Sequence, residues 1–92
     1  MTSHSQVKQV RIAIPIYGVT CWGSDALRLE AALESVAGVA SAYVNAAMEM
    51  AYVQFDSSRC GIPECTAAIQ RIGFQCGEAS IRSLDLRNKA EL

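Results

Sequence analysis

Four cysteines are the side chains of this chain that are best suited to chemistry, and they are Cys21, Cys60, Cys65 and Cys76. Thiolates bind soft metal ions and act as nucleophiles, so the surroundings of each thiol decide what the chain can do. An even number of cysteines can indicate disulfides, but residues 1–11 lack the apolar stretch of a secretory signal. The sequence therefore predicts a cytoplasmic protein whose thiols are free or bind metal.

Cys21 has the most distinctive position, because it follows a predicted strand and directly precedes a predicted helix. Ser24 or Asp25 is expected to cap that helix by accepting hydrogen bonds from the N–H groups of its first turn. The helix dipole and the same N–H groups stabilise a thiolate, which predicts a reactive or metal-ligating Cys21. The alternative is a leftover thiol in a loop that has lost its site.

Histidine, the usual partner of a catalytic thiol, occurs once, as His4 in the polar leader. A histidine-based triad and a folded histidine–metal cluster are therefore excluded. The chain also has no Cys-x-x-Cys sequence, the spacing that thiol redox enzymes use. We expect a binding module and no enzyme.

Length and composition predict one globular domain and argue against two kinds of partner. Of the 92 residues, 51% are apolar and 18% charged, which is enough apolar surface for a folded core. The net charge is -1, whereas a nucleic-acid surface needs a basic excess. No apolar run reaches the roughly 18–20 residues of a membrane span. We expect neither nucleic-acid binding nor membrane insertion.

Residues 7–17 alternate between apolar and other side chains, as a strand with one buried face does. The buried side carries Ile12 and Ile14 between two further apolar side chains, and Ala13 points to the opposite side. Pro15 has no N–H for a ladder, so it must lie near the end of the strand or where its nitrogen faces away from a partner.

The remaining periodicity predicts helix, strand, strand, helix and strand in that order. Residues 24–38 repeat apolar side chains at helical spacing and end at Gly38, a residue suited to the left-handed helix end. Residues 39–44 and 50–55 predict two strands, the second of which leads towards a helix opened by Pro63. A short fourth strand is expected after that second helix.

The order βαββαβ predicts an α+β fold, the ferredoxin-like sandwich, in which two helices cover one face of a four-stranded antiparallel sheet. Residues 1–6 form a leader in this prediction, and residues 7–82 form the domain. Residues 83–92 are a C-terminal tail, for which a short helix is the alternative.

Several aromatic side chains are expected on the face of the sheet that the helices leave open. Tyr17, Tyr43 and Tyr52 should lie there beside Ala13, and such a face is either simply uncovered or an association surface. The first helix carries an acidic flank that includes Glu30, which either steers a basic partner or is an ordinary solvated face.

One segment, Ile14-Pro-Ile-Tyr-Gly-Val-Thr-Cys21, resembles the first strand and metal loop of the heavy-metal-associated domain family. That family includes small copper chaperones and the N-terminal domains of metal-transporting P-type ATPases. The similarity continues over most of the chain, through Leu29-Glu30, Leu33, Val36-Ala-Gly38-Val39, Val44-Asn45, Phe55-Asp56, Ala68-Ile69 and Gly73-Phe74. The resemblance implies the same fold as the periodicity does, and a role in metal handling.

The metal motif departs from the family pattern, which is Gly-Met-Thr-Cys-x-x-Cys. Val19 stands in place of the methionine, and Ser24 stands three residues after Cys21. Aligning the helix with the family suggests one extra residue in the loop, so that Asp25 replaces the second cysteine. Cu(I) prefers thiolates, and two of them make a linear site, so a single thiolate should bind metal weakly without help.

The resemblance and the topology leave two sources for a second sulfur ligand. Cys76 opens the fourth strand at the loop end of the sheet. The family usually has an apolar core residue at this position, so core packing is the alternative to ligation. Cys21 of a second copy would rebuild the two-sulfur geometry in a dimer. Cys60 and Cys65 lie at the opposite end and are expected to be small apolar side chains.

These residues predict a soft-metal module whose ligands come from Cys21, Asp25 and Cys76. Cu(I) is the favoured ion, and Zn(II) or another soft divalent metal is the alternative. The expected partners are a metal-transporting ATPase or a second copy of the chain. The rival hypothesis is a metal-free interaction or dimerisation module that keeps the fold and has lost the site.

Overall fold

The computed structural model describes residues 8–20 and 23–86, and for Lys8 and residues 83–86 it describes the backbone alone. The elements, in chain order, are β1 (Lys8–Tyr17), α1 (Asp25–Glu34), β2 (Val39–Asn45), β3 (Met50–Asp56), α2 (Ile62–Arg71), β4 (Gln75–Cys76) and β5 (Ser80–Leu86). None of the helices in this part of the chain is long and apolar enough to cross a membrane.

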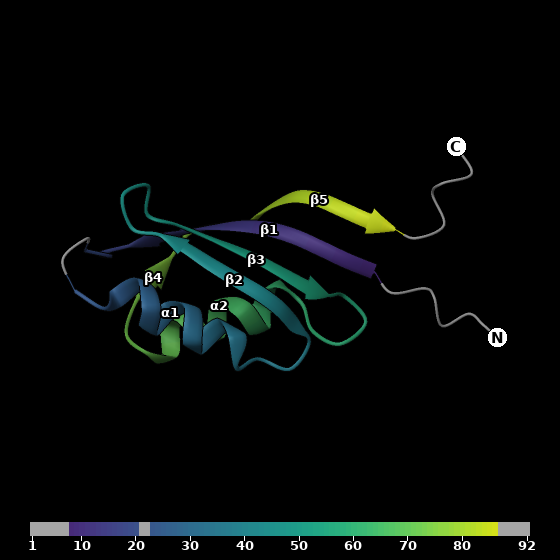
Figure 1. Ribbon diagram of the computed structural model, residues 1–92, viewed down its shortest axis with the longest axis horizontal. Helices are drawn as coiled ribbons and strands as arrows, with labels where there is room; N and C mark the ends of the chain where they lie inside the picture. Colours follow the sequence, from purple (N-terminus) through teal and green to yellow (C-terminus); the bar gives the residue numbers. More distant parts are fainter. Residues whose placement is uncertain (1–7, 21–22, 87–92) are drawn as a thin grey trace.

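The sheet is antiparallel, with β3 between β2 and β1, and with β4 and β5 on the other edge of β1. Both helices pack on the same face of this sheet, and the opposite face is left open (Figure 1). The ferredoxin-like sandwich that the sequence predicts is confirmed.

The fourth strand of the predicted sandwich is divided in two. One half of β1 pairs with β5, whereas Ile16 and Tyr17 pair with β4, and residues 77–79 lie between the two pairings. The carbonyl of Pro15 accepts the N–H of Gly77 at 2.9 Å, so the polar groups of Pro15 face this edge of β1. Because proline has no N–H to donate there, the ladder is interrupted at that point.

Strand β5 continues past residue 82, where the sequence analysis ends the domain. Its register with β1 runs from the pair Ala13–Ser80 to the pair Lys8–Leu86. Residues 83–86 are therefore neither the helix nor the tail that the sequence suggests, because the long β1 offers them an edge with unpaired backbone groups. Residues 87–92, the rest of the predicted tail, and the leader 1–6 lie outside the described residues.

The core lies between the sheet and the two helices. The predicted inward sides of β1 and β3 are confirmed, since every inward side chain there is at most 6% exposed. The helices contribute their own apolar stripes, which are buried against those strands. The buried core residues are Val10, Ile12, Ile14, Ile16, Val19, Leu29, Leu33, Val44, Ala51, Val53, Phe55, Cys65, Ala68 and Ile69.

Helix α1 is shorter than the periodicity predicts, because it ends at Glu34 and not at Gly38. Gly38 has φ +99° and precedes β2, so its left-handed conformation belongs to the turn that enters the strand. A Cβ atom at this position would lie 2.9 Å from Cβ of Arg59 and 3.2 Å from Sγ of Cys60. The glycine therefore permits a close approach between the start of β2 and the loop before α2.

Ala13 also departs from the expectation of an exposed residue on the open face. Its side chain is fully buried, although its neighbours Arg11 and Tyr17 on the same side of β1 are exposed. The reason is its small size and its central place, with Tyr52 of β3 beside it on one edge and Ser80 of β5 on the other.

Candidate metal site at the first loop

The β1–α1 loop carries the candidate ligand Cys21, which lies outside the described residues together with Trp22. The residues before it are held against the β2–β3 turn. The backbone N–H of Gly18 donates to Oε2 of Glu49 at 3.3 Å, and the N–H of Ile16 donates to the carbonyl of Glu49 at 2.9 Å. Gly18 has φ +90°, which lets the chain leave β1 in this direction. The entrance to the loop is therefore held by two backbone N–H groups that donate to Glu49, one to its side chain and one to its carbonyl.

Asp25, the first residue of α1, closes the loop on the other side of Cys21. Its Oδ2 accepts the backbone N–H of Thr20 at 3.3 Å and the Thr20 hydroxyl at 3.1 Å. Its Oδ1 lies 3.7 Å from Nη1 of Arg28. The alternative cap, Ser24, makes no side-chain capping bond. Both oxygens of Asp25 already have partners, so a metal ion bound by this carboxylate would share it with Thr20 and Arg28.

Val19 anchors the start of the loop in the core. Its side chain is 7% exposed and belongs to the core cluster. The position where the family carries methionine is thus an apolar anchor here, and the exposed Thr20 follows it directly. The chain turns from the core to the surface within these two residues, immediately before Cys21.

Cys76 lies on β4, directly opposite Ile16 of β1, and so at the end of the sheet where the loop begins. Its side chain is half-buried and packs against the core cluster. Burial raises the pKa of the Cys76 thiol, and a hydrogen bond with Gln70 opposes part of that rise. Cys76 is therefore a protonated thiol at neutral pH that retains access to solvent. Phe74, just before it, is half-buried and also packs on the core.

Cys60 and Cys65 lie together at the start of α2, close enough for each thiol to influence the pKa of the other. Cys65 is fully buried, whereas Cys60 is half-buried. Burial raises the pKa of Cys65 to about 12, and burial also raises the pKa of Cys60. A low dielectric disfavours the charged thiolate, so both groups stay protonated.

The described residues bring Thr20, Asp25 and Glu49 around the loop, with Cys76 on the adjoining strand. Within residues 8–20 and 23–86, no three histidine, cysteine or carboxylate side chains converge as a metal cluster. A closed zinc site of three or four ligands is thus not assembled from these residues alone.

Glu30 has a role that the sequence analysis did not find. The periodicity placed it on a solvated acidic flank of α1, but its Oε2 accepts the backbone N–H of Val44 at 2.8 Å. Val44 lies on β2, the edge strand, where an N–H would otherwise face outward without a partner. Glu30 therefore fastens α1 to the edge of the sheet. Its place four residues after Ala26 and three before Leu33, at the edge of the apolar stripe, was the available signal.

No family model and no curated protein matches this sequence. Solved structures do match over most of the chain. The CopZ metallochaperone superposes with a TM-score of 0.69 at 28% identity, over 73% of this chain and 98% of that one. A copper binding domain from HMA7, a P-type ATPase, has a TM-score of 0.69 at 29% identity, over 83% of this chain and 97% of that one.

A third structure is the N-terminal domain of a potential copper-translocating P-type ATPase from Bacillus subtilis, solved in its Cu(I)-loaded state. It has a TM-score of 0.68 at 25% identity and covers 84% of this chain and 91% of its own. All three neighbours are heavy-metal-associated domains. The chain thus has the fold of metal-trafficking domains, and this fold places the end of β1 and the start of α1 at one end of the sandwich.

Proposed function

We propose that this protein is a heavy-metal-associated module that binds and transfers a soft metal ion, Cu(I) in first place, through the thiolate of Cys21. The observation that carries the proposal is the anchoring of the loop on both sides of that residue. Thr20 is tied to Asp25, and Gly18 is tied to Glu49. These contacts fix the described residues on either side of Cys21, which supports a defined position for its thiol.

The second sulfur for Cu(I) comes from Cys76 or from Cys21 of a second copy, because Cu(I) favours two thiolates in a linear site. Cys76 supports the first arrangement through its place beside Ile16 and its partial exposure. Asp25 is the remaining candidate ligand, and it suits Zn(II) better than Cu(I) because a carboxylate is a hard donor. Its bonds with Thr20 assign it chiefly to holding the loop.

The proposed partner is a metal-transporting ATPase of the kind whose soluble domains share this fold, or a second copy of the chain. In this proposal the metal is cargo, and the module works in the cytoplasm without nucleic acid, membrane insertion or a catalysed reaction.

The test is native mass spectrometry of the reduced protein, titrated with Cu(I) without oxygen. The parent should retain one copper ion, held either by a single chain or between two chains, and Cys21→Ser should retain none. Cys60→Ser is the matched control, since it removes a thiol at the other end of the sandwich and should bind as the parent does. Cys76→Ser separates the two ligand sets. It abolishes a monomeric complex but leaves a dimer bridged by two Cys21 thiolates. Equal uptake by parent and Cys21→Ser, or none by either, would refute the proposal.

A second candidate function, a metal-free interaction module, is favoured by one specific observation. Tyr43 and Tyr17 expose 57% and 53% of their surface on the open face of the sheet. Exposed aromatic side chains are typical of association surfaces. Under this alternative, no variant of Cys21 changes the solution behaviour of the protein, whereas Tyr43→Ala does.

A further inference from the structure

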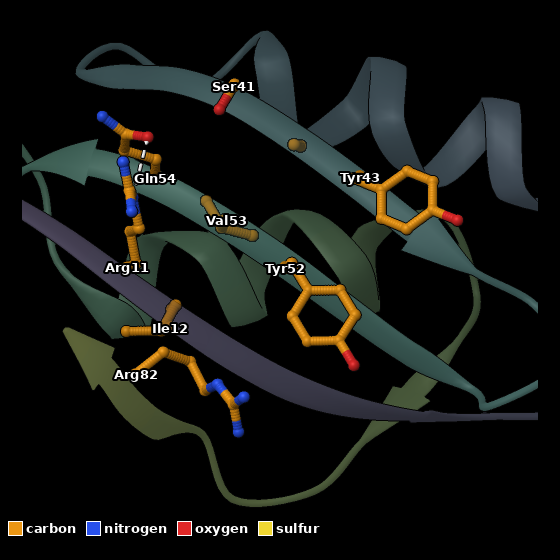
Figure 2. A pocket seen from close by; sticks show the side chains of 9 residues that line it. Arg11, Ile12, Ser41, Tyr43, Tyr52, Val53, Gln54 and Arg82 are labelled. Carbon is orange, nitrogen blue, oxygen red and sulfur yellow. Dashed lines mark hydrogen bonds between the residues drawn. The ribbon is translucent and has the colours of Figure 1, made fainter.

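The open face of the sheet carries a groove of about 330 Å³ between two rows of side chains (Figure 2). The strand register creates the rows. Ser41, Gln54 and Arg11 stand side by side across β2, β3 and β1. Tyr43 and Tyr52 stand beside each other two residues further along, which is a separation of about 7 Å. The groove therefore runs across the strands, with a polar wall on one side and an aromatic wall on the other.

Arg11 is held in place on the polar wall. Its Nε donates to Oε1 of Gln54 at 3.2 Å, and Nε2 of Gln54 donates to Oε1 of Gln9 at 3.0 Å. This chain of bonds uses the inner nitrogen of the guanidinium and leaves its two terminal amino groups for other acceptors. A carboxylate matches that pair of donors, and pre-orientation lowers the entropy that binding costs.

A second guanidinium reaches the groove from β5, because Arg82 lines it as well. The described residues that line the groove include these two arginines and no carboxylate. The groove is thus locally positive on a chain whose net charge is -1. A complementary occupant carries negative charge.

The aromatic wall supplies apolar contact next to that charge. The rings of Tyr43 and Tyr52 stack with centroids 6.2 Å apart and planes at 16°. The pair belongs to neighbouring strands and so presents a continuous surface along one side of the groove (Figure 2). Tyrosine and arginine are the residue types that dominate binding energy at protein interfaces.

Charge decides between the possible occupants. A nucleic acid needs a basic stripe, and two arginines on an acidic chain do not make one. A second copy seated on this face would bring the two arginines of each groove into one interface, and the lining residues of neither copy supply a carboxylate to compensate them. An acidic segment of another protein meets both walls without such a conflict.

We propose that the groove between the Arg11 row and the Tyr43–Tyr52 pair binds an acidic peptide segment of a partner protein. Its carboxylates pair with Arg11 and Arg82, and an adjacent apolar side chain packs on the two tyrosines. The site lies on the open face of the sheet, so it does not depend on metal binding by Cys21.

The experiment is an amide chemical-shift titration of the reduced full chain with a short peptide of alternating glutamate and leucine. The same peptide with glutamine in place of glutamate is the matched ligand control. The acidic peptide should give saturable shifts centred on residues 11, 41, 43, 52, 54 and 82, and the glutamine peptide should not. Added salt should weaken binding, since the pairs are exposed to solvent. Arg11→Gln and Arg82→Gln should each weaken it about tenfold, as expected for a charge-assisted pair.

Arg71→Gln is the matched protein control, because Arg71 is an exposed arginine in the last turn of α2, away from the groove. The Arg71→Gln variant should bind the acidic peptide with the same affinity as the parent protein. Absence of binding, equal binding of both peptides, or equal weakening by Arg71→Gln would each overturn the proposal. A dimer in sedimentation that Tyr43→Ala dissociates would also overturn it, by making a second copy the occupant.

Discussion

At the loop end of the sandwich, Cys76 is half-buried beside the entrance to the Cys21 loop, whereas at the other end Cys65 is fully buried against Cys60. Both regions place a thiol on the helix-covered side of the sheet. They differ in access to solvent and in the extent to which burial raises the thiol pKa. Residue type alone therefore does not identify a ligand, because a thiol is a packing group at one end and a candidate ligand at the other.

Alkylation of the folded protein should separate the thiols at the two ends by the largest factor. At pH 8, Cys65 should react with iodoacetamide at least about a thousandfold more slowly than in the unfolded chain. Its pKa of about 12 leaves very little thiolate at that pH. The rate should rise as pH increases towards that pKa. Pulsed labelling with mass spectrometry of peptides measures each cysteine separately.

In that measurement Cys76 is the internal control and should react well ahead of Cys65. If the two cysteines were labelled at the same rate in folded protein, the contrast between the two ends would be wrong.

The next largest effect concerns stability. Replacing Cys65 by serine should lower the free energy of unfolding by about 1–3 kcal/mol, because it puts a hydroxyl in a fully buried apolar position. Cys76→Ser should cost less than about 1 kcal/mol, since this side chain is partly exposed and beside Gln70. Urea unfolding followed by circular dichroism gives both values. If Cys76→Ser lowered the free energy of unfolding more than Cys65→Ser, Cys76 and not Cys65 would be the packing residue.

The smallest effect tests what holds the loop. Asp25→Ala should destabilise the protein by about 1 kcal/mol, because it removes the bonds from Thr20 and a negative charge at the start of α1. The same variant should weaken Cu(I) retention by Cys21. Glu34→Ala, which removes an exposed carboxylate from the last turn of the same helix, should be neutral. Equal behaviour of the two variants would show that Asp25 does not anchor the loop.

Most of the fold was predictable from local periodicity. The alternation around Ile12 and Ile14 and the buried side of β3 depend on a period of two, which survives in a single sequence. The division of the fourth strand into β4 and β5 was predictable only in part. The sequence indicated that Pro15 could not donate, but the consequence depended on which edge of β1 it faced.

The candidate site was less predictable, because its contacts join residues that no short pattern connects. Glu49 is 31 residues away from Gly18 in sequence, and Gln54 is 43 residues away from Arg11. The sequence predicts that Glu30 is a solvated charge or steers a basic partner, whereas in the fold its carboxylate accepts a hydrogen bond from β2. Such pairs form only when the sheet register and the helix position are set together.

Local sequence was enough to predict the order of elements, the apolar face of each, and a loop with one cysteine before the first helix, because all three depend on neighbours a few residues apart. The tertiary structure was needed to show that Asp25 holds Thr20 and that Arg11 and the tyrosines border one groove, and it confirmed the burial that the sequence predicts for Cys65. Burial, hydrogen-bond partners and shared surfaces arise from contacts between distant segments, and those contacts exist only in the folded chain.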